Sequence, residues 1–479
     1  MSLEEYAACE QRRLFLRQGA CGFGAIALGA LLAQDGRTAA IAEGTPEDLV
    51  SHFKPRAKNV IFVFMSGAPS QLDLFDHKPK LTEHHGEPVP ASLLKGLNDS
   101  LIAGSARVMA SPRRFSRYGQ CGMTFSDYLP QLATQADELC MVHSMVSDTS
   151  NHHPAQQLMN CGVPKFGHPS MGAWVTYGLG SEAHDLPGFV VMLSNSGKGV
   201  DGGSSLWTNG FMPSSYRGVT FRGRGDPILH LTSPPGVDRR TQRARLDAIS
   251  DLNRRHLEET GGSEINSRIA SYELAFRMQS AGPELIDLAN ETASTRTLYG
   301  LDNDTTRPFG TNCLLARRMV ERGVRFVQLY HSTWDDHSHL NQKLKENCDM
   351  TDLPMAGLLV DLKQRGLLDH TLVIWGGEFG RTPMNEIRRG NVKGAEGRDH
   401  HHFAFTMLLA GGGIRAGHIV GRTDDFGYHV VEDRVHVHDL QATILHCLGM
   451  NHKQLTFRHL GRDFRLTDVS GNVRPALLR

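Results

Sequence analysis

The order of the apolar runs along this chain restricts its fold more than any other feature. Twice, a stretch with helical periodicity ends at a glycine, and a short run of β-branched and aromatic residues follows at once. These stretches are "FGTNCLLARRMVERGVRFVQLY" (309–330) and "MAGLLVDLKQRGLLDHTLVIWGG" (355–377). The short runs "KNVIFVFM", "LCMVHSM" and "FAFTMLLAGGG" look like further strands. Such alternation predicts an α/β fold in which a mostly parallel sheet is sandwiched by helices.

The middle of the chain has a different composition. Residues 194–236 are rich in Gly, Ser and Pro, which predicts long loops, whereas residues 238–299 are charged and helical in pattern. We interpret the region at about 190–300 as an insertion that covers or borders the functional site. After it, "VHVHDLQATILHCLGM" predicts a C-terminal helix with Asp439 near its start and Gly449 past its end.

The N-terminal segment predicts export from the cytoplasm. Arg12 and Arg13 precede a Gly- and Ala-rich apolar stretch, and "AIA" at 40–42 offers small residues for cleavage. The core "RRLFLR" resembles a twin-arginine signal, which implies a bacterial protein exported in the folded state to the periplasm or beyond. An ordinary amphipathic helix is the alternative. We expect residues 1–42 to be removed, and no later run is long enough to be a membrane span.

The balance of residue types favours metal chemistry over binding to nucleic acid. The chain has 51 basic and 51 acidic residues, and this neutrality argues against a nucleic-acid partner. It also has 25 histidines, and histidine is the commonest metal ligand. The cysteines after residue 42 are too sparse for a disulfide scaffold and include no CxxC pair, although one or two bridges would suit an oxidising compartment.

Polar side chains occur in the stretches that follow four candidate strands, although "MSGAPS" separates the first strand from its first aspartate. In order, these strands are followed by Asp73 and Asp76, by His152 and His153, by "HSTWDDHSHL" at 331–340, and by Glu378 and Arg381. In open α/β sheets, ligands bind beyond the carboxyl ends of the strands. We therefore expect the ends of the strands at 58–65, 140–146, 324–330 and 371–375 to share one rim and to form a metal site there.

The stretch "WDDHSH" is the strongest candidate for one wall of that site. In an extended segment, Asp335, His337 and His339 all point the same way, and in a helical turn Asp335 and His339 still share a face. A hydrogen-bonded polar loop is the alternative. "GRDHHH" adds His400 and His401, but these residues precede their strand. They reach the same rim only if the preceding loop folds back or the strand runs antiparallel.

The motifs together resemble a known family. "FMSGAPSQLDLFD", "NHHPAQQLMNCG", "WDDH", "WGGEFGRTP" and "GRDHHHFAFTMLLAGGG" are similar to successive motifs of an exported bacterial family called domain of unknown function 1501. That family is similar to sulfatases within the alkaline phosphatase superfamily. The resemblance runs from about residue 58 to "GRDFRLTDVSG" near the C-terminus. It implies a sulfatase-like α/β domain over residues 43–479 and suggests a planctomycete source.

The resemblance also implies one or two divalent metals held by Asp and His residues at strand ends. Matched motif by motif, Glu378 stands at a metal-binding Asp of sulfatases and His152 stands at the nucleophile. Phe379 stands where sulfatases have a metal-binding His, and His152 has neither a hydroxyl nor a thiol. The covalent step of the superfamily therefore has no agent at the matched position.

Two functions remain open on this basis. The first is a metal-dependent hydrolase of sulfate or phosphate esters outside the cytoplasm, acting on a small anionic ester or on a sulfated or phosphorylated glycan. The second is a non-catalytic metal- or glycan-binding relative. The missing nucleophile favours the second, and the ligands at strand ends favour the first. The sequence predicts neither the ester type nor the oligomeric state.

The predicted site comprises nine residues. The mixture of carboxylates and imidazoles suits Zn, Mn or Fe better than Ca or Mg. In the W-D-x-H pattern usual for the family, His337 rather than His339 is the ligand. His152 is predicted to be catalytic, Arg381 to bind the substrate anion through its planar fork of donors, and the metal ligands are predicted to be Asp73, Asp335, His337, His339, Glu378, His400 and His401.

Overall fold

A computed structural model describes residues 51–90, 106–194, 199–222, 228, 236–261, 263–386 and 395–479. The predicted export signal at 1–42 lies outside these residues, so export stays a prediction. None of the helices found within the described ranges has both the length and the apolar character needed to cross a membrane.

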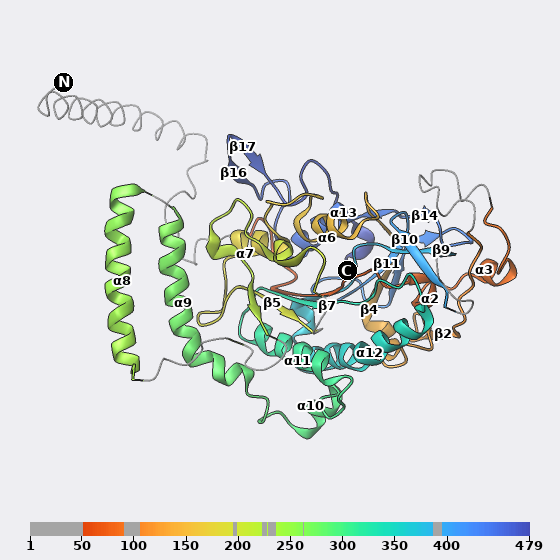
Figure 1. Ribbon diagram of the computed structural model, residues 1–479, viewed down its shortest axis with the longest axis horizontal. Helices are drawn as coiled ribbons and strands as arrows, with labels where there is room; N and C mark the ends of the chain where they lie inside the picture. The colour runs from red at the N-terminus through yellow and green to blue at the C-terminus, as the bar shows by residue number, and fades with distance from the viewer. Residues whose placement is uncertain are drawn as a thin grey trace, which may run out of the picture. The chain divides into compact units, whose positions relative to one another are not determined.

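A nine-stranded sheet forms the centre of the domain (Figure 1). Eight strands follow one another in the order β12-β4-β11-β8-β1-β7-β5-β6, and β15 pairs with β4. Only β11 runs antiparallel to its neighbours, so the predicted mostly parallel sheet is confirmed. The strands are β1 (Asn59–Met65), β4 (Leu139–Val146), β5 (Phe189–Leu193), β6 (Val219–Phe221), β7 (Phe326–His331), β8 (Thr371–Gly376), β11 (Phe405–Ala410), β12 (His418–Val420) and β15 (Val435–His436).

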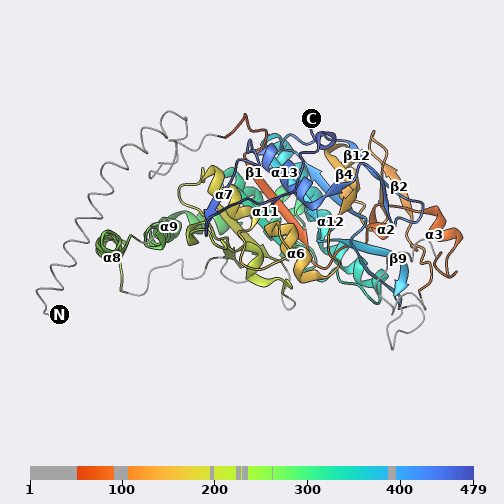
Figure 2. The same ribbon diagram turned by 90° about the horizontal axis from the view of Figure 1, so that it is seen from above.

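Helices cover both faces of this sheet (Figures 1 and 2). One face packs against α6 (His152–Cys161), α7 (Met171–Leu179) and α13 (Val437–Cys447), and the other packs against α11 (Arg307–Glu321) and α12 (Leu340–Gln364). Strand β1 shows why its sequence suits this position. Because side chains alternate along a strand, Val60 and Phe62 enter one core while Ile61 and Val63 enter the other. The continuous apolar run from Val60 to Met65 is therefore buried on both faces of the sheet.

The helices α11, α12 and α13 end just before the glycines that the sequence predicts. Gly323 follows α11 with a φ of 82°, and Gly366 follows α12 with a φ of 68°, so each helix ends in the left-handed conformation that glycine tolerates. Helix α13 begins with a capping box in which the Asp439 side chain accepts a hydrogen bond from the backbone of His436. Gly449 lies past its end, as predicted.

Helices occupy the part of the predicted insertion at 238–299, as its sequence indicates. They are α8 (Arg239–Thr260), α9 (Ser263–Ile286) and α10 (Ala293–Leu298). In both views α8 and α9 lie at the opposite end of the domain from the hairpin of β9 (Gly380–Glu386) and β10 (Gly397–His401) (Figures 1 and 2). These two helices therefore do not border the site described below, which includes that hairpin.

The remaining short elements lie outside the central sheet. They are α2 (Gln71–Leu74), α3 (Pro79–Glu83), β2 (Phe115–Tyr118), β3 (Met123–Ser126), β13 (Arg422–Thr423), β14 (Val430–Glu432), β16 (Phe457–His459), β17 (Arg462–Phe464) and the 3-10 turns at Leu132–Glu138, Gly203–Trp207, Ser214–Tyr216, Leu368–His370 and Pro475–Leu477.

One edge of the sheet collects the chain segments that carry polar side chains. Strands β1, β7 and β8 are parallel neighbours, and β4 points the same way because β11 is antiparallel to both β4 and β8. The four carboxyl ends therefore lie on one rim, as predicted. Since β11 runs in the opposite direction, its amino-terminal end reaches the same rim. The antiparallel alternative left open by the sequence is thus the one observed.

Candidate metal centre

Four side chains converge at this rim. Their ligand atoms, the Nε2 atoms of His152, His337 and His400 and the Oδ1 atom of Asp335, lie within 4.8 Å of one another. Asp335 Oδ1 is 3.2 Å from His152 Nε2, 2.9 Å from His337 Nε2 and 3.2 Å from His400 Nε2. The Nε2 atoms of His337 and His400 are 2.9 Å apart. Each of the four side chains is between 11% and 21% exposed, so the cluster is mostly buried but remains accessible to solvent.

Three chain segments deliver these side chains. His152 is the first residue of α6, which begins soon after β4. Asp335 and His337 lie in the loop between β7 and α12, and His400 comes from β10. The sheet therefore brings together residues that are up to about 250 positions apart in sequence.

Two glycines allow the segments to approach this closely. A Cβ atom on Gly67, at the end of β1, would lie 2.5 Å from the backbone nitrogen of Asp335, and Gly67 has a φ of 110°. A Cβ atom on Gly397, at the start of β10, would lie 2.0 Å from the carbonyl carbon of His337. Both distances are too short for any side chain, so these positions require glycine.

Each of the three imidazoles is held through its other ring nitrogen. His152 Nδ1 is 2.7 Å from Glu378 Oε1, His400 Nδ1 is 2.7 Å from the carbonyl oxygen of Ser150, and His337 Nδ1 bonds to Glu386. A carbonyl or carboxylate oxygen only accepts, so each Nδ1 carries the proton. In the neutral ring, Nε2 then presents its lone pair to the cluster. Metal-binding histidines are held by a carboxylate or a carbonyl in this same way.

Three lone pairs and a carboxylate oxygen that face one another need a positive charge between them. Protons supply it when no metal is bound. Burial alone would lower the pKa of His152, but hydrogen bonds from its ring to the carboxylates of Asp335 and Glu378 outweigh burial and raise that pKa to about 9. Burial also opposes the charge on Asp335, yet the three imidazoles and the Arg381 guanidinium hold the pKa of its carboxyl well below the usual range.

The spacing of the four atoms suits a divalent transition metal. Zn–N and Zn–O bonds of about 2.0–2.2 Å in a tetrahedron place neighbouring ligand atoms about 3.3–3.6 Å apart. The four separations given above, 2.9–3.2 Å, are slightly shorter, and all four atoms lie within 4.8 Å of one another. Three imidazole nitrogens and one carboxylate oxygen form a set that suits Zn, Mn or Fe better than the all-oxygen sites of Ca and Mg.

Glu378 and Arg381 lie directly behind the cluster and are both fully buried. Glu378 accepts hydrogen bonds from His152 and from Gln156 Nε2, so it holds the ring of His152 and is not among the four converging groups. The Arg381 guanidinium donates to Asp335 Oδ1 at 2.8 Å and to the carbonyl oxygens of Ala68 and other residues. Its donors are engaged within the protein, so the geometry favours a role in holding Asp335 over direct contact with a substrate.

Besides Glu378, three predicted metal ligands lie outside the cluster. Asp73 forms a buried ion pair with Arg398 at 2.8 Å, and His401 Nε2 bonds to the backbone oxygen of Tyr428 at 2.6 Å. His339 caps α12 in the left-handed conformation (φ 53°), which breaks the alternation expected of an extended segment and directs its ring elsewhere. None of the three is part of the ligand set proposed below.

The structure also adds Glu386, which the sequence reasoning missed, and places Asp399 of the "GRDHHH" stretch close to the same histidine. Glu386 and Asp399 form a second acidic group with His337, whose Nδ1 is 3.9 Å from Asp399 Oδ1. Glu386 reaches His337 because Glu386 pairs with Gly397 across the β9–β10 hairpin, and Gly397 lies against the backbone of His337. No local pattern in "MNEIRRGN" indicates this contact, because it depends on the register of the hairpin.

Solved structures that are similar in fold to this chain include enzymes of ester and phosphonate chemistry. The lipoteichoic acid synthase LtaP from Listeria monocytogenes is 10% identical with a TM-score of 0.37, and the match covers 83% of this chain and 74% of that chain. The PsFucS1 sulfatase from Pseudoalteromonas sp. is 12% identical with a TM-score of 0.35, and the match covers 94% of this chain and 74% of that chain. The phosphonate monoester hydrolase SpPMH from Silicibacter pomeroyi is 12% identical with a TM-score of 0.34, and the match covers 84% of this chain and 75% of that chain. Similarity this low gives no information about activity.

Sequence comparison identifies the family directly. No curated protein matches the chain. The family described as "Protein of unknown function (DUF1501)" matches residues 57–478, which is most of the chain and agrees with the predicted extent of the resemblance. The chain therefore belongs to the DUF1501 family.

Proposed function

We propose that this protein is a metal-dependent hydrolase of phosphate or sulfate esters, with a divalent ion held by His152, Asp335, His337 and His400. The observation that carries the proposal is the shared orientation of the three imidazoles. All three present Nε2 to one point beside Asp335 Oδ1, and all three are fixed through Nδ1. A polar loop without a ligand would have no need for three rings held in this way.

A divalent ion at this point would supply Lewis-acid polarisation of the ester's phosphoryl or sulfuryl oxygen. The protein's own residues would hold and orient the reacting groups. Glu378, Glu386 and the Ser150 carbonyl would keep the rings in place, and Arg381 would keep Asp335 in place. Asp399 is 21% exposed and lies at the edge of the cluster, where its carboxylate could accept the proton of an attacking water.

Water is the nucleophile that we favour, because His152 has no nitrogen left for attack. Its Nδ1 bonds to Glu378 and its Nε2 faces the cluster. Among the described residues, the hydrogen bonds and ion pairs of the four cluster side chains involve no hydroxyl or thiol group. We therefore assign His152 as a ligand rather than as the covalent agent that its matched position implies.

A non-catalytic metal- or glycan-binding protein is the second candidate, and the same lack of a neighbouring hydroxyl or thiol favours it. The two candidates share the metal centre and differ in turnover. For both, we place the protein outside the cytoplasm on the strength of the paired arginines Arg12 and Arg13, and we take a small anionic ester or a sulfated or phosphorylated glycan as the partner.

Chromogenic phosphate and sulfate esters test the proposal. Protein loaded with Zn, Mn, Fe, Mg or Ca should hydrolyse at least one ester class, and Asp335→Asn should lower the bound metal severalfold and abolish the activity. Asp349→Asn is the matched control, because Asp349 is an exposed carboxylate paired with Lys345 on α12. Stoichiometric metal without any turnover would reject the hydrolase in favour of the second candidate.

A further inference from the structure

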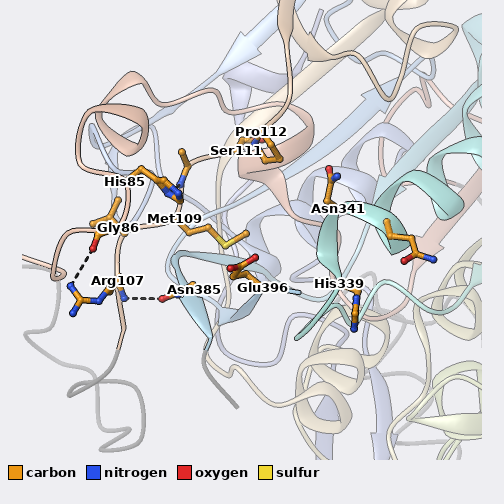
Figure 3. Close-up of a pocket in the computed structure, with 13 residues that line it drawn as sticks. His85, Gly86, Arg107, Met109, Ser111, Pro112, His339, Asn341, Asn385 and Glu396 are labelled. Atoms are coloured by element: carbon orange, nitrogen blue, oxygen red, sulfur yellow. Dashed lines mark hydrogen bonds between the residues drawn. The ribbon is translucent and has the colours of Figure 1, made fainter. Parts of the chain in front are cut away.

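A large pocket lined by both polar and apolar side chains lies next to the metal centre (Figure 3). Its volume is about 770 Å³, which is within the range of ordinary ligand sites. In Figure 3, His85 and Arg107 stand on one side and His339 and Asn341 on the other, with Glu396 between them. The walls come from the chain around α3, from residues 107–112, from the start of α12 and from the two strands of the hairpin.

The pocket and the metal centre share their supporting elements but face different ways. Asn385 lines the pocket, whereas the next residue, Glu386, bonds to His337 of the cluster. Successive residues of a strand point to opposite faces, so β9 separates the two sites. The pocket is therefore a subsite beside the cluster, and its side chains take no part in holding the metal.

Several polar side chains of the pocket are fixed at one atom and unpaired at the other. The Oδ1 atom of Asn341 accepts from the Tyr128 hydroxyl at 2.8 Å, and the Oδ1 atom of Asn385 accepts from the Arg107 backbone nitrogen at 2.8 Å. For each, the Nδ2 group has no partner among the described residues. His85 Nδ1 accepts from the Ala110 backbone nitrogen at 3.1 Å, so the neutral ring carries its proton on Nε2. These groups are oriented N–H donors that need no rearrangement to bind a ligand.

The charge of the pocket indicates what those donors would bind. Among the lining residues that the structure describes, there is one arginine and one glutamate, and the Arg107 guanidinium already donates to the carbonyl oxygen of Gly86 at 3.1 Å. The other polar side chains of this described lining are mostly amides and imidazoles, and they stand beside the apolar side chains of Val108, Met109 and Pro112. Uncharged oxygen atoms, such as the hydroxyl and ring oxygens of a sugar, match neutral donors of this kind.

From these observations we propose that the pocket between α3, the start of α12 and the β9–β10 hairpin binds uncharged sugar units of a glycan. This binding requires neither the metal nor an ester, so it goes beyond the function proposed above. It would also give the neighbouring metal centre a carbohydrate-borne ester as its substrate, if both proposals hold.

Saturation-transfer NMR on metal-free protein tests the pocket directly. The probes are neutral oligosaccharides (maltohexaose, cellohexaose, mannohexaose and tetrameric N-acetylglucosamine) at millimolar concentration and pH 8. At least one should bind, and the double variant Asn341→Asp with Asn385→Asp should weaken that binding roughly 10-fold or more, because it removes two donor groups. Each substitution keeps the Oδ1 acceptor that Tyr128 or Arg107 requires, so the fold is preserved.

Two controls separate the outcomes. Asn303→Asp makes the same change at an exposed turn, where Oδ1 accepts from the Thr305 backbone nitrogen, and should leave binding unchanged. Asp335→Asn, which changes a side chain of the metal centre but none of the pocket, should also leave sugar binding unchanged. The proposal is overturned if none of the four probes binds, if only a sulfated oligosaccharide or a peptide binds, or if the double variant binds as well as the wild type. Sugar binding without any ester hydrolysis would support the pocket and reject only the hydrolase.

Discussion

Replacing Glu378 with Gln separates a metal ligand from a residue that supports one. The carboxylate of Glu378 is fully buried and accepts from three donors: His152 Nδ1 at 2.7 Å, Gln156 Nε2 at 2.9 Å and the Gly67 backbone nitrogen at 3.1 Å. Glutamine has the same shape but offers one acceptor oxygen and one NH₂ group. All three donors reach Oε1, and the Gly67 nitrogen also lies 3.4 Å from Oε2, where the NH₂ group of glutamine would face it. The ring of His152 keeps an acceptor but loses its charged partner.

The expected loss follows from the place of Glu378 behind the ligand. Removal of such a partner weakens metal binding about 10- to 100-fold, which corresponds to about 1.4–2.7 kcal/mol. His152→Ala removes a ligand and should weaken binding further. Competition with a chromogenic chelator for Zn²⁺ at pH 7.5 measures both affinities. Glu432→Gln, at an exposed carboxylate paired with Arg422, is the matched control and should bind Zn²⁺ like the wild type.

Two results would refute this reasoning. If Glu378→Gln binds Zn²⁺ as tightly as the wild type, the hydrogen bond to His152 has no role in the metal centre. If its affinity falls as far as that of His152→Ala, then Glu378 is itself a ligand, as the sequence motif suggests. Circular dichroism must show that each variant remains folded at the temperature of the titration.

Three further predictions concern charge and protonation. Asp335→Ala should lower the bound metal severalfold and abolish any ester hydrolysis while the far-ultraviolet circular dichroism stays unchanged. Binding of Zn²⁺ at pH 7 should release at least one proton, measured by calorimetry in buffers of different ionisation enthalpy, because the partners of His152 raise the pKa of its ring to about 9 despite burial. Asp336 is 1% exposed with no hydrogen-bond partner for its carboxyl among the described residues, and burial raises its pKa to about 7. A raised folded-state pKa means that the unfolding free energy falls as the pH rises from about 4 to about 7. Between pH 5 and pH 8 the wild type should therefore lose about 3 kcal/mol more of its unfolding free energy than Asp336→Asn does. Equal losses in the two proteins would contradict this prediction.

Much of the fold could be predicted from local patterns. The strands β1, β4, β7 and β8 are short apolar runs bounded by glycine or polar residues, and such patterns depend only on neighbouring positions. Their shared rim follows from the rules of parallel sheets. The direction of β11 could not be derived in this way, because a strand pattern reads the same in both directions.

The site was predictable only in part, for a related reason. Asp335, His337 and His400 are brought together because each lies within a few residues of a strand end on the rim. His339 is only two positions from His337, but one left-handed residue turns its side chain away. Glu386 could not be found from the sequence because its contact with His337 arises from hairpin register. Side-chain direction after a strand ends is set by tertiary contacts that local pattern does not contain.

The position of the metal is the most direct test of the proposed centre. Crystals of protein purified with Zn²⁺ or Mn²⁺, measured at the absorption edge of that metal, would show the ion as an anomalous difference peak. We expect one ion, bonded to Asp335 Oδ1 and to the Nε2 atoms of His152, His337 and His400 at distances of about 2.0–2.2 Å. A stoichiometric ion located elsewhere, for example at Asp73, or bonded to the Nδ1 atoms instead, would contradict it.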